Sequence, residues 1–396
     1  MFQWVHPLKK IITFTEIINS QEWQIKCCPN LTSLSDLLFP KKLKLIHMSK
    51  VTVVGAGNVG ATVANVLAHK DIVKEIVLLD LKGDFAKGKA LDSWQQAPID
   101  YYSTSMKGTG DYRDTKNSDI VVITAGLPRK PGMTRDDLIA INAGIVSSVT
   151  KSIMKYSKNP IIIVVSNPLD VMTYAAHKAS GLKSNRVFGM AGILDTARYR
   201  AFLATELNVS PKDLQAVLMG GHGDTMVPLP RYTTVAGIPV TELIEKGKLK
   251  AIVERTKKGG GELVKLMGTS AWYAPGAAAA QMVESIVKDD NRIFPCCTAL
   301  NGEYGMKDTY LGVPVKLGKN GIEQIIELKL NKAEMNLLKK SNAAVTSVMK
   351  TYDAIAKKAE AEAEAEAKKK PAKKKAAVKK TAAKKASPPK AKAAKK

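Results

Sequence analysis

Short apolar runs alternate with longer segments of helical periodicity between residues 48 and 192. The apolar runs are rich in valine and isoleucine, lack polar alternation, and lie at residues 51–54, 75–79, 119–124, 160–165 and 186–188. This pattern is typical of parallel strands that helices cover on both faces. Helical spacing is clearest at residues 58–69, 135–156 and 169–179. Because βαβ crossovers are right-handed, the order predicts a doubly wound parallel α/β domain over residues 48–192.

The pattern changes after residue 192. A helix is predicted at residues 195–207, and strand-like runs punctuated by glycine and proline follow it. Residues 312–328 have the alternation expected of an antiparallel meander. Helical spacing returns from residue 332 to residue 367. We therefore expect an α+β second domain over residues 193–356, closed by a long C-terminal helix.

The two flanking segments differ in composition from both domains. Residues 357–396 are a low-complexity sequence of Lys, Ala and Pro, which buries too little apolar surface to fold and predicts a disordered tail beyond the helix. Residues 1–47 show no sustained period, and their acids and lack of arginine argue against a signal peptide or a mitochondrial presequence. We expect this extension to be an upstream over-extension of the reading frame, with Met48 as the natural start, or else a poorly ordered segment.

Composition places the chain as a whole among ordinary globular proteins, with 45% hydrophobic and 24% charged residues. The formal net charge is +25, but residues 357–396 alone hold 16 lysines against 4 glutamates. Nearly half of the excess charge therefore lies in the tail, and the overall charge says little about the folded body.

Cysteine usage suggests a reducing compartment. The four cysteines form two adjacent pairs, Cys27–Cys28 and Cys296–Cys297, and neighbouring cysteines bridge poorly. No histidine cluster or CxxC spacing accompanies them, so we predict no metal site and treat Cys296 and Cys297 as core residues. No apolar run reaches 18 residues, so the sequence predicts no membrane span. We expect a cytoplasmic protein.

A glycine-rich turn joins the first predicted strand to the first helix. It has the G-x-G-x-x-G spacing in the sequence Gly55-Ala56-Gly57-Asn58-Val59-Gly60. The first glycine permits a tight turn, the second admits a pyrophosphate, and the third allows the helix to pack closely on the sheet. The helix N-terminus directs N–H groups and partial positive charge at the phosphates. The motif alone is weak, but its place between a strand and a helix predicts a Rossmann dinucleotide site.

An acidic residue at the end of the second predicted strand bears on the choice between NAD and NADP. Asp80 lies twenty residues after Gly60 and can accept hydrogen bonds from ribose hydroxyls, whereas it would repel a 2′-phosphate. The alternative is an ordinary polar residue at a strand end. We predict NAD rather than NADP.

Four further segments carry candidate chemistry. They are AGLPRKPGMTRDD at residues 125–137, VSNP at 165–168, AGILDTAR at 191–198 and MGGHGDT at 219–225. With the glycine turn, these five motifs resemble, in order and with sensible spacing, the lactate/malate dehydrogenase family over about residues 48–350. The resemblance implies a Rossmann domain, an α+β catalytic domain, and an oxidoreductase that transfers hydride between NAD and a 2-hydroxy acid. The resemblance also implies assembly as a homodimer or homotetramer.

Two residues match the family's proton-transfer pair. Oxidising a 2-hydroxy acid requires removal of the hydroxyl proton, and histidine titrates near neutrality. His222, in the GGHGD turn, matches the proton acceptor and donor; taken alone, it is equally well a turn residue. Asp195 matches the carboxylate that fixes the imidazole and favours its charged form.

Several other positions match binding residues of the family. Arg198 lies three residues after Asp195, on the same helix face, and matches the arginine that grips the substrate carboxylate. The alternative is a surface ion pair. Asn167 ends an apolar strand and matches an asparagine that contacts substrate and cofactor, although it also suits a helix cap. The resemblance also implies that Asn142 and Val165 contact the cofactor.

Two arginines in a Gly- and Pro-punctuated loop bear on the substrate. By resemblance, Arg135 polarises the reacting carbonyl when the loop closes, and Arg129 occupies the position that is glutamine in lactate-oxidising relatives and arginine in malate-oxidising ones. A second substrate carboxylate would be buried unpaired without that cation, at a cost of several kcal/mol. The expected reaction is reversible oxidation of (S)-malate to oxaloacetate, as part of the tricarboxylic acid cycle. Oxidation of lactate is the alternative.

The tail suggests a function of another class. Residues 368–396 contain 14 lysines and no acid, a composition similar to that of histone-type basic tails. Such a tail can bind nucleic acid or other polyanions weakly through counterion release. The alternative is a solubilising appendage. The rest of the chain lacks aromatic-rich basic motifs for base stacking, so polyanion binding ranks below the enzyme prediction.

Overall fold

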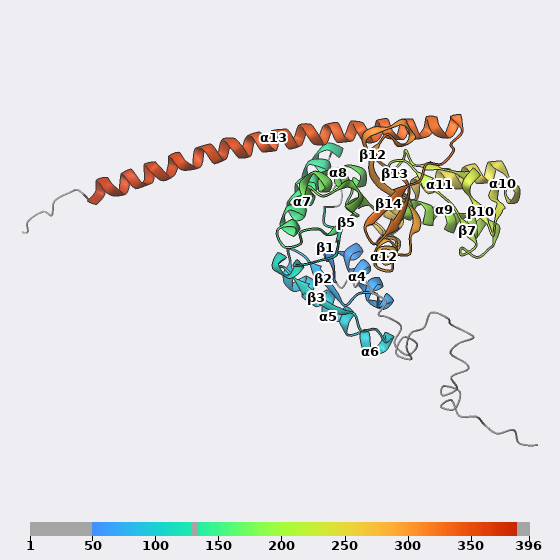
Figure 1. The fold of residues 1–396 in the computed structure, drawn as a ribbon, viewed down its shortest axis with the longest axis horizontal. Coiled ribbons are helices and arrows are strands. Elements are labelled where there is room, and N and C mark those ends of the chain that lie inside the picture. Colours follow the sequence, from blue (N-terminus) through green and yellow to red (C-terminus); the bar gives the residue numbers. More distant parts are fainter. Residues whose placement is uncertain (1–49, 128–133, 386–396) are drawn as a thin grey trace, which may run out of the picture. The chain divides into compact units, whose positions relative to one another are not determined.

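The computed structural model describes residues 50–127 and 134–385 (Figure 1). Side chains are described for most of these residues up to Lys358, with Arg135 an exception. None of the described helices is long and apolar enough to cross a membrane. Residues 1–47, including Cys27 and Cys28, lie outside the described residues, so the two expectations for them stay open.

A nine-stranded sheet in the order β14-β13-β12-β6-β5-β4-β1-β2-β3 forms the centre of the fold. Its first six strands in sequence pair in parallel. They are β1 (Lys50–Val54), β2 (Glu75–Leu79), β3 (Ser105–Thr109), β4 (Ile120–Ile123), β5 (Ile161–Val164) and β6 (Val187–Gly189). Strand order reverses between β1 and β4, which is the switch point where doubly wound sheets bind their ligands.

Helices connect the parallel strands and pack against them. In this half they are α4 (Asn58–Lys70), α5 (Gly83–Trp94), α6 (Ala97–Asp100), α7 (Arg135–Met154) and α8 (Leu169–Ser180). Helix α5 packs on β2 and β3, whereas α7 packs beside α8. The two central strands β4 and β5 are fully apolar, and every one of their residues is buried. Burial on both faces explains the absence of polar alternation.

The second half continues the same sheet. Strands β12 (Arg292–Asn301), β13 (Lys307–Gly318) and β14 (Gly321–Ile325) form an antiparallel meander, and Cys297 of β12 pairs with Gly189 of β6. The helices of this half are α9 (Gly192–Leu207), α10 (Val240–Leu243), α11 (Lys246–Met267) and α12 (Tyr273–Val287). Helices α9 and α12 pack against the meander, and α11 packs on α9. Five short strands form two small sheets: β7 (Leu214–Gln215), β8 (Leu218–Met219), β9 (Val227–Pro228), β10 (Thr234–Val235) and β11 (Ile238–Pro239). The predicted fold class, a doubly wound Rossmann sheet followed by an α+β second part, is confirmed, while the boundary near residue 192 stays a prediction.

The last helix, α13 (Lys332–Lys385), packs against α7, α8, β9 and β13 before it continues along the chain (Figure 1). It continues to Lys385, past residue 367, where the predicted helical pattern ends and the predicted disordered tail begins. Ala, Glu and Lys are strong helix formers, and adding residues to an existing helix costs far less than starting one, which accounts for the difference. The prediction for residues 386–396 lies outside the described residues.

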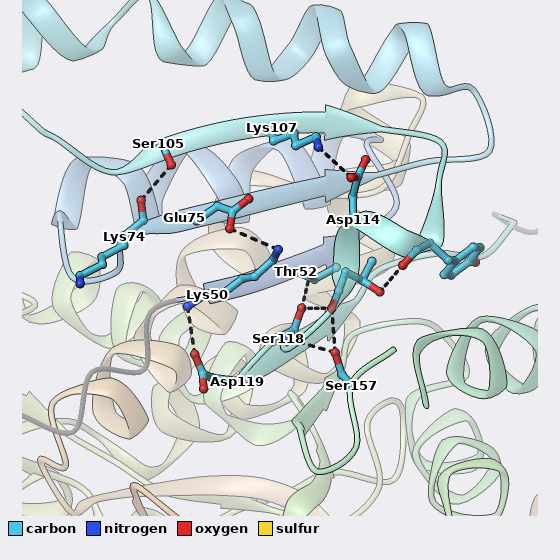
Figure 2. Close-up of polar contacts among 12 residues, drawn as sticks. Lys50, Thr52, Lys74, Glu75, Ser105, Lys107, Asp114, Ser118, Asp119 and Ser157 are labelled. Atoms are coloured by element: carbon cyan, nitrogen blue, oxygen red, sulfur yellow. Dashed lines mark hydrogen bonds and ion pairs between the residues drawn. The ribbon is translucent and has the colours of Figure 1, made fainter. Parts of the chain in front are cut away.

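A polar network holds the amino ends of the parallel strands (Figure 2). The hydroxyls of Thr52 and Ser118 lie 2.7 Å apart, and the Ser157 hydroxyl accepts from the Ser118 N–H at 3.0 Å. The N–H of Lys50 donates to the Asp119 carboxylate at 3.0 Å. These bonds satisfy buried polar groups at the amino edge of the sheet, whereas the functional groups described next all follow the carboxyl ends of strands.

Candidate active site

The glycine turn after β1 leaves room for a dinucleotide phosphate. Gly55 adopts φ +106°, a conformation that favours glycine, and a Cβ at Gly60 would overlap the carbonyl oxygen of Gly55. At Gly57, by contrast, a Cβ would meet nothing within 4 Å. The helix α4 that follows has no side-chain cap, so its first N–H groups stay available. The turn therefore fits a bound pyrophosphate at the helix N-terminus.

Asp80 follows β2 beside this turn. Its Oδ2 accepts the N–H of Ala56 at 2.8 Å, and its Oδ1 accepts the N–H of Lys82 at 2.9 Å. These two bonds hold the carboxylate in place, and each oxygen keeps a lone pair for a ribose hydroxyl. The position fits the cofactor preference predicted from the sequence.

We expect Asp80→Asn to weaken the preference for NAD over NADP by about tenfold, the effect of roughly 1.4 kcal/mol of electrostatic repulsion on a binding ratio. Asparagine keeps one oxygen for the Ala56 N–H of the turn but loses the bond from the Lys82 N–H. The ratio of kcat/KM values for the two cofactors measures the change. An unchanged ratio would show that the carboxylate does not select the cofactor.

A histidine–aspartate pair lies in the second half of the fold. His222 follows β8 in a glycine-rich loop, and Asp195 lies in the first turn of α9 with its side chain only 2% exposed. His222 Nδ1 and Asp195 Oδ2 are 2.8 Å apart. Since an ionised carboxylate only accepts, Nδ1 carries the proton and Nε2 is left to exchange a proton with a substrate. The sequence predicted the two roles, and the structure brings the two side chains together.

The electrostatics around His222 favour the charged imidazole. Burial by itself lowers the pKa of His222, but the carboxylates of Asp195 and Asp170 more than offset it, and the pKa is raised above the ordinary value of 6.5. The Arg198 charge opposes this effect. The pair is therefore arranged to stabilise a proton taken up at Nε2.

Arg198 extends the pair into a cluster. Its Nη1 lies 3.3 Å from Asp195 Oδ1, as two residues on one helix face allow, and its side chain is 14% exposed. Its Nε is buried and has no hydrogen-bond partner among the described residues. A cavity of about 300 Å³ lies here, with His222 and Gly260 in its wall. A buried guanidinium with unused donors beside a cavity suits an anionic group, and a carboxylate would engage it in two parallel bonds.

Asn167 follows β5 and reaches the same region from the other half of the fold. It is exposed and lines a cavity of about 520 Å³ together with His222 and Val345. The amide of Asn142 donates to the Asn167 carbonyl at 2.7 Å, and it also exchanges bonds with the backbone of Leu127. Asn142 therefore orients Asn167, a role that sequence reasoning missed, and its predicted cofactor contact stays a prediction. Val165 is buried in the core, with 9% of its surface exposed.

The two arginines of the loop between β4 and α7 fall at the limit of what the structure describes. Arg129 lies outside the described residues. Arg135 is the first residue of α7, directly after the N-cap Thr134, which forms a reciprocal capping box with Asp137. The cap sets the start of the helix. The predicted roles of both guanidinium groups stay predictions.

Comparisons with known proteins agree on one family. Residues 49–189 match the family model described as the lactate/malate dehydrogenase NAD-binding domain, and residues 193–356 match the lactate/malate dehydrogenase alpha/beta C-terminal domain. The chain is 69% identical over 307 residues to a malate dehydrogenase of Cytophaga hutchinsonii, which covers 77% of this chain and 98% of that protein.

Solved structures support the same relationship. A malate dehydrogenase from Salinibacter ruber aligns with TM-score 0.76 and 55% identity, over 78% of this chain and 99% of that one. A lactate dehydrogenase from Cryptosporidium parvum, complexed with lactic acid and nicotinamide adenine dinucleotide, aligns with TM-score 0.74 and 37% identity, over 77% and 98% of the two chains.

Proposed function

This chain belongs to the lactate/malate dehydrogenase family and is an NAD-dependent dehydrogenase; on that premise we propose that it interconverts (S)-malate and oxaloacetate, with His222 as proton acceptor and donor. The observation that carries the proposal is the contact of His222 with Asp195 at 2.8 Å, beside the incompletely paired guanidinium of Arg198. The high identity to malate dehydrogenases supports the substrate.

Each residue of the cluster has a separate task. Neutral His222 Nε2 takes the proton of the substrate hydroxyl, and Asp195 stabilises the imidazolium that forms. Arg198 binds the carboxylate next to the reacting carbon, which orients the hydroxyl toward the imidazole. Bound NAD supplies the acceptor for the hydride that leaves the same carbon. In the reverse direction the imidazolium returns its proton to the carbonyl oxygen.

The remaining assignments are part of the proposal. Arg135 polarises the reacting carbonyl, Arg129 binds the second carboxylate of the diacid, and Asn167 contacts substrate near the nicotinamide. The glycine turn from Gly55 to Gly60, Asp80, Asn142 and Val165 form the cofactor site. The loop between β4 and α7 ends at the start of α7, and Leu138 in the first turns of α7 lines the larger cavity. This position supports a role for residues of the loop at the same site.

The direct test is product analysis after incubation of the purified protein with (S)-malate and NAD. We expect oxaloacetate and NADH in equal amounts, and no turnover of (R)-malate. Formation of pyruvate from lactate at a higher kcat/KM than oxaloacetate from malate would favour the lactate alternative.

We also propose that the protein assembles as a homodimer or homotetramer. Helices α5 and α6 and their flanking residues expose several large apolar side chains, namely Leu81, Phe85, Leu91, Trp94, Ile99 and Tyr101. Exposed apolar surface of this kind is typical of protein interfaces. Leu91, 57% exposed, lies within this group.

We expect Leu91→Glu to shift the assembly toward monomers, because a buried unpaired carboxylate at an interface costs several kcal/mol. Sedimentation velocity of the variant and the wild type at matched concentrations measures the shift. The same change at Leu337, which is 50% exposed on α13, is the control. Equal sedimentation of the Leu91 variant and the wild type would exclude this face as an interface.

Two further parts of the proposal concern the location of the protein and the lysine-rich end of the chain. A cytoplasmic location is supported by Cys296 and Cys297, which are free, buried thiols.

Weak polyanion binding by the lysine-rich end of the chain is supported by its composition. Truncation after Lys358 keeps the buried Tyr352 and the Asp353–Lys178 ion pair, and it should abolish salt-sensitive retention on heparin while turnover is kept.

A further inference from the structure

A second carboxylate contacts the backbone of the candidate proton-transfer residue. Asp170 lies in the first turn of α8, three residues after Asn167, and only 8% of its surface is exposed. Its Oδ2 accepts the backbone N–H of His222 at 2.9 Å. His222 is therefore held by Asp195 at its ring and by Asp170 at its backbone. The two acids come from the two halves of the fold.

The loop that carries His222 is anchored at three consecutive residues by three different elements. Gly220 exchanges backbone hydrogen bonds with Gly312 of β13, at 2.8 and 3.1 Å. The Gly221 N–H donates to the Ser341 hydroxyl of α13 at 2.8 Å. Asp170 supplies the third anchor, and it alone acts on the histidine itself and carries an ionisable group.

The environment of the other carboxylate oxygen, Oδ1, indicates more than a structural role for Asp170. Oδ1 is buried and has no hydrogen-bond partner among the described residues, although the thiol of Cys297 is close enough to interact with the carboxylate. Burial raises the pKa of Asp170, and the His222 charge opposes this effect. A neutral amide would accept the same N–H without the cost of burying a half-satisfied carboxylate. A positive charge that develops on His222 during turnover would be stabilised by the ionised carboxylate of Asp170, which an amide could not do.

We propose that Asp170 is a positioning residue for the reaction: it fixes the backbone of His222 and acts as the second carboxylate that stabilises the imidazolium. The inference rests on the proposed function, because it requires His222 to gain a proton during turnover. The segment from Asn167 to Asp170 therefore has two roles at the site. Its first residue lines the cavity, and its last residue holds the loop that carries His222.

Other ionisable groups lie around Asp170 and His222 and contribute to the same titration. Asp195 and Arg198 come from α9, and the Cys297 thiol comes from β12. Asp224 lies on the histidine loop, and two lysines of α11 line the smaller cavity: Lys257 and Lys258. Lys257 is paired with Glu254 at 2.9 Å. A test must therefore change Asp170 without displacing these groups.

The test compares Asp170→Asn with Asp170→Leu in both reaction directions over a range of pH. Asparagine keeps an oxygen for the His222 N–H but removes the charge, so the pH at which malate oxidation gains activity should move to lower values. Oxidation needs neutral His222, and loss of a nearby negative charge makes the neutral form easier to reach. Leucine removes the anchor as well, and kcat should fall about a hundredfold with little change in KM, the usual cost of a misplaced catalytic group.

The control is Asp289→Asn, which alters a surface carboxylate bound to Lys319 and should leave the pH profile unchanged. Thermal unfolding of all variants separates lost stability from lost turnover. A wild-type pH profile and wild-type kcat for Asp170→Asn would overturn the inference while leaving the proposed function intact. A KM effect without a kcat effect in the leucine variant would also overturn it. If the wild type itself fails to turn over malate, the proposed function has failed instead.

Discussion

Replacing His222 by glutamine is expected to lower kcat for oxaloacetate reduction by about a thousandfold, within the range of 10²–10⁴ that general acid–base catalysis supplies. The imidazole is the group whose ring contacts Asp195 at 2.8 Å and whose Nε2 is left to exchange a proton. Glutamine has no group that titrates near neutrality, so no stabilised proton is available to the carbonyl oxygen. KM should change much less, because Arg198 remains to bind the substrate carboxylate. Steady-state oxidation of NADH measures both values.

The matched control is His69→Gln. His69 lies on α4, where its ring is 3.3 Å from Asp100 and one third of its side chain is exposed. We expect wild-type kcat from this variant. Retention of more than about a tenth of the wild-type kcat by the His222 variant would contradict its role as proton donor.

Replacing Arg129 by glutamine is expected to lower kcat/KM for oxaloacetate by about a thousandfold, with little loss, or a gain, for pyruvate. The reason is electrostatic: the second carboxylate of oxaloacetate would be buried without a cation, whereas pyruvate has no such group. Several kcal/mol of uncompensated charge correspond to a change of this size. Measuring kcat/KM for both oxo acids in the same preparation gives the ratio directly.

Arg113→Gln is a suitable control for that variant. Its side chain is 78% exposed and pairs only with the neighbouring Asp111 among the contacts described, so the substrate ratio should stay at the wild-type value. An unchanged ratio in the Arg129 variant would remove the electrostatic basis for the substrate assignment.

Most of the fold could be predicted because its central strands are apolar on both faces. The predicted run at residues 75–79 coincides with β2, and β5 lies within the predicted run at residues 160–165. Strand β3 was missed because its sequence, SMKGT, lies at the edge of the sheet and has an exposed serine and lysine. An edge strand needs only one buried face, and five residues are too few to reveal it.

The contacts of the candidate site were harder to foresee than its residue types. The His222–Asp195–Arg198 cluster was predicted through motif resemblance, since two of its members share one helix face. The contact of Asp170 with the His222 N–H joins residues 52 positions apart in the chain. The contact of Asn142 with the Asn167 carbonyl joins residues 25 positions apart. Sequence reasoning missed both contacts because no local pattern links residues at such separations. In the sequence, Asp170 has the pattern of an ordinary acid in the first turn of a helix, which the helix dipole alone would justify.

The central claim is that this cleft acts on a four-carbon diacid with NAD. The most direct measurement is kcat/KM of the wild-type protein for oxaloacetate and for pyruvate, each with saturating NADH at pH 7. We predict a preference for oxaloacetate of at least about a hundredfold, because only the diacid uses every cation that the site provides. Equal values for the two acids, or a preference for pyruvate, would contradict the account.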